Sequence, residues 1–172
     1  MKKNDRGFSL VELIVVVLIM AIIAVALAPQ VMKWVHNSRI ATDVQTRDSL
    51  KEQCQIALTD KDAFNMVKDG GYMITITKDI SGNTTIKYGD NTGTDIAPDP
   101  STDAYWATLL KVTGDSDFTG FAKRFQIKST AETEDIVLKV KVYDSGYTIA
   151  SLTGIDGNDD VEVAESNDPF ED

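Results

Sequence analysis

The apolar residues of this chain are concentrated near its N-terminus. Between Glu12 and Lys33 the sequence reads LIVVVLIMAIIAVALAPQVM, and none of these residues is charged. A helix of about twenty residues is roughly 30 Å long, which is the thickness of the hydrocarbon core of a bilayer. The pattern therefore predicts a membrane-spanning helix near the N-terminus.

Helical spacing continues beyond this run. Apolar residues recur every three or four positions as far as Leu58, and polar residues of both charge signs lie between them. We therefore expect one helix from Phe8 to about Thr59, with a length of roughly 78 Å. A bilayer needs less than half of that length, so the C-terminal half of the helix should pack on a globular head.

The rest of the chain shows strand patterns. Apolar and polar residues alternate in five segments: Tyr72–Lys78, Thr84–Tyr88, Phe121–Ser129, Glu134–Tyr143 and Tyr147–Leu152. A short helix is expected from Asp103, as its N-cap, to Val112. A long helix followed by an antiparallel sheet that buries one face on it is an α+β fold.

The charges predict the orientation of the chain in the membrane and argue against one class of partner. With 17 basic and 27 acidic residues the net charge is -10, which argues against direct nucleic-acid binding through a basic face. Lys2, Lys3 and Arg6, against Asp5, precede the apolar run. By the positive-inside rule they keep the N-terminus in the cytoplasm and send the head outward.

The chain is poor in the residue types that commonly carry out catalysis. Cys54 is the only cysteine and His36 the only histidine, so an intrachain disulfide and a histidine-rich metal site are both excluded. On one helix the two residues would lie about 27 Å apart, too far to share a proton. We expect no catalytic residues and interpret Cys54 as a small apolar side chain on a helix face.

Two general interpretations of the N-terminus remain open. Ala24, Ala26 and Ala28 fit the small-residue pattern of a cleaved secretory signal, although Pro29 would then follow the cut. An uncleaved anchor that only tethers an external domain explains the apolar length. Neither interpretation assigns a role to Glu12.

A third interpretation starts from the sequence RGFSLVEL, in which Gly7 follows a basic residue and precedes Phe8, with Glu12 four residues further on. This resembles the N-terminal motif of type IV pilins and of the pseudopilins of type II secretion and competence machines. The resemblance implies cleavage between Gly7 and Phe8 by a prepilin peptidase, N-methylation of Phe8, a pilin fold and assembly into a filament. It also implies a kink of the anchor helix at Pro29.

Glu12 has a physical reason to take part in assembly. A carboxylate that enters a bilayer costs a few kcal/mol unless it finds a partner. Cleavage would create one, the amine of Phe8, which lies on the same helix face as Glu12 at i and i+4. The amine of an adjacent subunit could serve equally, and that contact would also set the register between subunits.

A weaker signal concerns calcium. Asp156, Asn158 and Asp160 alternate like the first ligands of a calcium loop, but Asn167 stands where an EF-hand has glutamate. Some pseudopilins hold calcium in a head loop, so the resemblance keeps another type of site open. We favour a solvated acidic segment with no cofactor, because Gly154–Asp172 holds eight acids and no base.

The sequence thus predicts a leader at residues 1–7, an assembly helix at 8–32, an amphipathic half at 33–59 and a head at 60–172. The predicted function is that of a structural pilus subunit, in the cytoplasmic membrane as a precursor and on the cell surface after assembly. Its expected partners are other copies of itself, prepilin peptidase, the pilus assembly machinery and membrane lipid. The alternatives are a pseudopilin and a membrane-anchored external binding module that does not polymerise.

Overall fold

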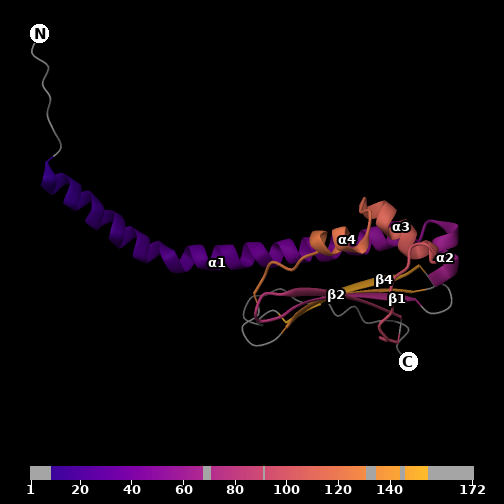
Figure 1. Cartoon of the computed structure of the whole chain (residues 1–172). Coiled ribbons are helices and arrows are strands. Elements are labelled where there is room, and N and C mark those ends of the chain that lie inside the picture. The colour runs from indigo at the N-terminus through magenta and orange to yellow at the C-terminus, as the bar shows by residue number, and fades with distance from the viewer. Residues whose placement is uncertain (1–8, 68–70, 91, 131–134, 144–145, 155–172) are drawn as a thin grey trace, which may run out of the picture. The chain divides into compact units, whose positions relative to one another are not determined.

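The structure is a computed structural model that describes residues 9–67, 71–90, 92–130, 135–143 and 146–154. It contains the helices α1 (Leu10–Ala57), α2 (Lys61–Val67), α3 (Ala104–Thr113) and α4 (Phe118–Arg124), and the strands β1 (Tyr72–Lys78), β2 (Thr84–Asp90), β3 (Ile136–Val142) and β4 (Thr148–Thr153) (Figure 1). A long helix precedes a four-stranded antiparallel sheet, which confirms the expected α+β class.

The chain forms two compact units, residues 1–38 and 39–172. We call them the N-terminal unit and the head, and α1 begins in the first and ends in the second. In the N-terminal unit the large apolar side chains of α1 are exposed. Leu10, near its start, is 75% exposed, and Trp34, near its end, is 68% exposed. Within the described residues, α1 is the one helix long and apolar enough to cross a membrane.

The sheet of the head has the strand order β2-β1-β3-β4, and every neighbouring pair is antiparallel. Ile74 of β1 lies opposite Tyr88 of β2 and Val140 of β3. Because side chains alternate along a strand, these residues share the inner face of the sheet. In Figure 1 α3, α4 and the last part of α1 lie on one side of the sheet.

The core of the head fills the space between this inner face and the helices. Leu50, Cys54 and Ala57 from α1 are fully buried there beside the inward side chains of β1 and β3. Trp106 of α3 is 1% exposed and makes tilted or edge-on contacts with the rings of Tyr72, Tyr88 and Phe118. The amphipathic spacing predicted for the second half of α1 therefore corresponds to core contacts.

The prediction of a strand at Phe121–Ser129 was wrong. Residues 118–124 form α4, and the segment after it is irregular. Asp117 caps the helix by accepting a hydrogen bond from the Gly120 N–H at 2.8 Å. Phe121 and Phe125 are both buried, since their four-residue spacing places them on the same face of a helical turn.

A further helix was not predicted. α2 is seven residues long, and its start is fixed by Asp60, whose Oδ1 accepts hydrogen bonds from the N–H groups of Asp62 and Ala63, each at 3.0 Å. By contrast, the predicted cap of α3 is confirmed. Asp103 accepts hydrogen bonds from the Tyr105 and Trp106 N–H groups.

Candidate processing and assembly site

Glu12 lies in the first turn of α1 and makes a contact that the sequence analysis missed. Its Oε2 accepts a hydrogen bond from the backbone N–H of Ser9 at 3.0 Å. Ser9 precedes the first helical residue, and Glu12 is the third residue of the helix. The spacing S-x-x-E is that of a capping box, in which the acidic side chain satisfies an N–H group at the helix start.

This hydrogen bond holds the carboxylate of Glu12 toward the N-terminal end of the helix. The position suits a negative charge, because the unpaired N–H groups of the first turn make that end of a helix electropositive. Gly7 and Phe8, the residues predicted to flank the cleavage site, lie outside the described residues. The pairing of Glu12 with the Phe8 amine stays a prediction.

The part of α1 in the N-terminal unit presents an apolar surface on every side, with Glu12 in its first turn. Its exposed large hydrophobic residues are Leu10, Val11, Leu13, Ile14, Val15, Val16, Val17, Leu18, Ile19, Met20, Ile22, Ile23, Val25, Leu27, Val31, Met32, Trp34 and Val35. Soluble monomers rarely expose a contiguous patch of this kind. A helix that is apolar all round is normally covered by lipid or by other protein.

Pro29 lies inside α1, and the helix continues through it without interruption. A proline there removes one hydrogen bond of the helical ladder, that to the carbonyl oxygen of Val25, and crowds the preceding turn. The kink expected at this residue stays a prediction.

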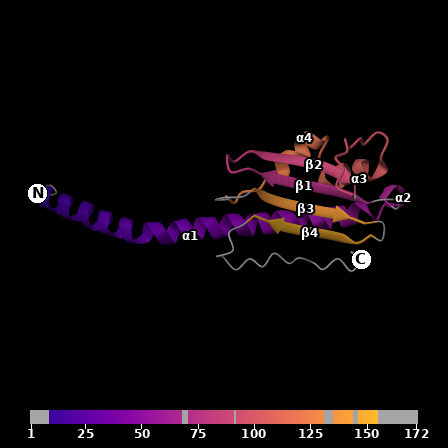
Figure 2. The same cartoon turned by 90° about the horizontal axis from the view of Figure 1, so that it is seen from below.

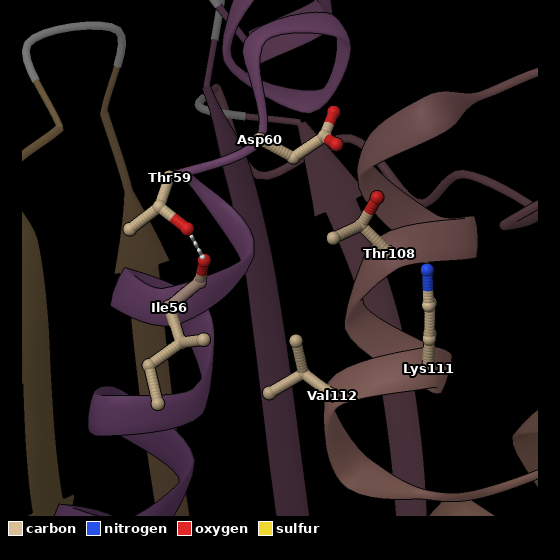
Figure 3. A pocket seen from close by; sticks show the side chains of 6 residues that line it. All are labelled: Ile56, Thr59, Asp60, Thr108, Lys111 and Val112. Atoms are coloured by element: carbon tan, nitrogen blue, oxygen red, sulfur yellow. Dashed lines mark hydrogen bonds between the residues drawn. The ribbon is translucent and has the colours of Figure 1, made fainter.

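One groove of the head has been compared with the requirements of a catalytic site. Figure 3 shows this groove, lined by Ile56, Thr59, Asp60, Thr108, Lys111 and Val112. The Thr59 hydroxyl donates to the Ile56 carbonyl oxygen at 2.7 Å, and Asp60 already caps α2. None of the six residues is a histidine or a cysteine, so the groove contains neither a cysteine nucleophile nor a histidine base.

Cys54 is equally unsuited to catalysis. Its side chain is completely buried, and this burial raises the pKa of the thiol to about 12. A thiol with such a pKa stays neutral at physiological pH and is a poor nucleophile. The residue belongs to the core cluster, as expected for a small apolar side chain.

Metal binding has no support in the part of the chain that the structure describes. No group of three or more histidine, cysteine, aspartate or glutamate side chains is placed to hold an ion there. The weak calcium candidates Asp156, Asn158 and Asp160 lie outside the described residues.

Comparison with known families gives one match. The model of the prokaryotic N-terminal methylation motif matches residues 2–28, a segment that contains Gly7, Phe8, Glu12 and most of the apolar run. No curated protein and no solved structure matches the chain. The chain therefore carries, ahead of an α+β head, the N-terminal methylation signal of type IV pilins and pseudopilins.

Proposed function

We propose that this chain is the precursor of a structural subunit of a type IV pilus-like filament. A prepilin peptidase cuts it after Gly7, Phe8 is N-methylated, and the mature chain polymerises through α1. The observation that carries this proposal is the apolar surface of the N-terminal unit, at whose start Glu12 is the one acid among the described residues of that unit. The methylation motif over the same residues supports it.

The parts of the chain then take separate roles. Residues 1–7 are the leader, 8–32 the anchor and assembly helix, and 33–59 the amphipathic half of the long helix, which enters the head at residue 39. Residues 60–172 are the rest of the displayed head. The precursor sits in the cytoplasmic membrane, where lipid covers the apolar helix. After assembly other copies of the chain cover it, and the pilus machinery and the peptidase are its transient partners.

Glu12 is the residue on which assembly depends. Cleavage places a cationic amine on Phe8, one residue before the N–H group that Glu12 binds in the precursor. At 4 Å and an effective dielectric constant near 20, a carboxylate and an amine attract by about 4 kcal/mol. This attraction offsets much of the cost of moving Glu12 into an apolar environment. When the amine belongs to the next subunit, repetition of the contact builds a helical filament.

The processing step is tested by the intact mass and N-terminal sequence of the protein from its native membrane. An N-methylated Phe8 start supports the proposal. A start at Pro29 would instead indicate a secretory signal, and retention of Met1 would indicate a tether.

The assembly step is tested with the variants Glu12→Ala and Glu12→Gln. Both should be processed at Gly7, yet sheared filaments should fall at least about tenfold, since each removes the charge that pairs with the amine. Glu52→Ala is the matched control, because Glu52 is an exposed acid on the same helix within the head. Normal filament yield from the Glu12 variants would overturn the proposal.

The amount of surface filament with and without this chain distinguishes a pilus subunit from a pseudopilin. A pseudopilin carries the same signal and is processed in the same way, so mass alone does not distinguish it. Deletion of the whole coding sequence should remove surface filaments if this chain builds a pilus. Loss of a secreted enzyme or of DNA uptake with filaments unchanged would favour the pseudopilin.

A further inference from the structure

The uncharged run of α1 is bounded by residues of a different chemistry. Glu12 precedes it, and Lys33 and Trp34 follow it. The residues between Glu12 and Lys33 carry no charge, and their one polar side chain is that of Gln30, about one helical turn before Trp34. The run therefore has a defined start and a defined end.

The distance between these two ends matches the thickness of a bilayer. Glu12 and Trp34 are about 33 Å apart along the helix, at 1.5 Å per residue. In Figure 2 this first part of α1, in indigo, is a continuous helix. At a typical tilt of about 20° it would cross about 31 Å of membrane, and the hydrocarbon core is about 30 Å thick. One of the two residues would then lie at each boundary.

Trp34 has the chemistry of an interfacial residue. It is 68% exposed, and an indole ring favours the headgroup region because it combines a large apolar surface with one N–H donor. Lys33, beside it, can extend its ammonium group to a lipid phosphate while its methylene chain stays on apolar surface. The polar residues His36 to Arg39 follow. These features fit the outer boundary of the bilayer.

Glu12 fits the inner boundary for a different reason. Its carboxylate accepts the hydrogen bond from the Ser9 N–H at 3.0 Å, and this bond directs it toward the N-terminal end of α1, away from the apolar run. A charged side chain costs most at the centre of a bilayer and far less near its edge, where water reaches it. Lys2, Lys3 and Arg6 precede it in the sequence, as expected for the cytoplasmic side.

From this spacing and chemistry we infer that, in the membrane-embedded chain, Lys33 and Trp34 bind the outer headgroup region of the bilayer while Glu12 stays hydrated at the inner one. The partner of this surface is a phospholipid bilayer, contacted at two fixed depths. The carboxylate of Glu12 then loses its water only when the helix leaves the bilayer for a filament, and it needs an amine as its partner at that step. The inference rests on the membrane stage of the proposed function, but not on cleavage or polymerisation.

Depth-dependent quenching of tryptophan fluorescence tests the outer boundary. The full chain is reconstituted at a low ratio of protein to lipid in vesicles of phosphatidylcholine and phosphatidylglycerol, whose acyl chains carry bromine either near the headgroup or near the methyl end. Trp34→Phe is the matched control, because it leaves only Trp106, which is 1% exposed in the head. The signal that this variant lacks is that of Trp34.

We expect bromine near the headgroup to quench the Trp34 signal at least about twofold more strongly than bromine near the methyl end. Equal quenching by the two lipids, or stronger quenching near the bilayer centre, would overturn the inference. So would the absence of quenching by either lipid, since Trp34 would then lie in water or against protein.

Cysteine labelling tests the inner boundary. In a full-length Cys54→Ala chain, Val11→Cys places one thiol beside Glu12, and Met20→Cys places one within the uncharged run. The two positions are a matched pair, because Val11 is 66% and Met20 65% exposed on the helix itself. In inside-out membrane vesicles, a charged maleimide that does not cross the bilayer should label Val11→Cys at least about tenfold faster than Met20→Cys, because thiols ionise in water and not in hydrocarbon. The two rates should become equal in denaturing detergent. Equal rates in the vesicles would place Glu12 among the acyl chains and overturn the inference.

These outcomes are separate from those that test processing and assembly. A chain that starts at N-methylated Phe8 and builds filaments, but whose Trp34 lies near the bilayer centre, would overturn the inference and leave the proposed function standing. A chain that retains Met1 and forms no filament, with Trp34 and Glu12 at the two boundaries, would overturn the proposed function and support the inference.

Discussion

The carboxylate of Asp43 accepts a hydrogen bond from the backbone N–H of Ser129, a residue 86 positions later, at 2.8 Å. The same oxygen, Oδ2, also accepts from the Ser129 hydroxyl, while Oδ1 accepts from the Lys128 N–H at 2.6 Å. Asp43 is 1% exposed, so water contributes little to its solvation. These bonds to a charged acceptor fasten the head portion of α1 to the segment that leads into β3.

Asp43→Ala should lower the free energy of unfolding of the head by about 3 kcal/mol, because it leaves two inward N–H groups without their acceptor. Urea unfolding of the full chain in detergent, followed by tryptophan fluorescence, measures the change. Asp48→Ala is the control, since Asp48 is exposed and pairs with the adjacent Arg47. Similar destabilisation by both variants would contradict the role given to Asp43.

Replacement of the two tryptophans should affect the stability of the head to very different extents. Trp106 is 1% exposed in the aromatic core of the head, and Trp34 is 68% exposed in the N-terminal unit. Trp106→Ala should cost about 3–5 kcal/mol of head stability, whereas Trp34→Ala should leave it within about 0.5 kcal/mol. Circular dichroism during urea unfolding measures the stability of both variants, because its signal does not depend on the tryptophan that each variant lacks. A large loss of head stability in Trp34→Ala would contradict the assignment.

Alkaline pH should weaken the head. Burial raises the pKa of the Cys54 thiol from 9.0 to about 12 and raises the pKa values of Tyr88 and Tyr105 above their ordinary range. A raised pKa in the folded state means that stability is complete below pH 9 and is lost as pH rises toward 12, since the unfolded chain ionises first. Above pH 9 the thiol alone should cost about 1 kcal/mol per pH unit.

The midpoint of urea unfolding, measured from pH 7 to pH 11, checks this dependence. Cys54→Ala should show a shallower decline between pH 9 and pH 10 than the unmodified chain, because only the tyrosines still titrate with a shift. A thiol reagent provides the companion test. Cys54 should react only after unfolding, and rapid labelling of the folded chain at pH 8 would be inconsistent with its burial.

Gly154→Ala should destabilise the head by about 2–3 kcal/mol, because the added Cβ would collide with the Asp135 carbonyl oxygen in addition to the strain of a positive φ. Gly82→Ala is the matched control. Its φ is +88°, but a Cβ there meets nothing within 4 Å, so only the backbone cost of about 1 kcal/mol remains. Thermal unfolding of both variants separates the collision from the backbone strain.

Sequence patterns predicted the elements that are determined by residues close together in the chain. β1 has the predicted bounds, because YMITITK alternates over its whole length and packs one face inward. Asp103 was identified as a cap because a cap bonds to residues two and three positions later. The Ser9–Glu12 capping box is equally local, and its S-x-x-E spacing is present in the sequence, although it was not predicted.

Features that depend on distant partners could not be predicted in this way. Nothing near Asp43 in the sequence indicates that it will meet Ser129, so its burial could not be predicted. The alternation at Phe125, Ile127 and Ser129 resembles a strand, and all three residues are buried. The backbone there bonds to Asp43 rather than to a neighbouring strand, which is why the strand prediction failed.

The continuity of α1 from Leu10 to Ala57 has a mechanical consequence. A pulling force applied to the N-terminal unit enters the head along the backbone of this helix. There the packing of Leu50 and Cys54 and the hydrogen bonds of Asp43 bear the load together. With a single cysteine in the chain, no intrachain disulfide shares that load. The tensile strength of the head thus rests on how tightly one helix is held by non-covalent contacts.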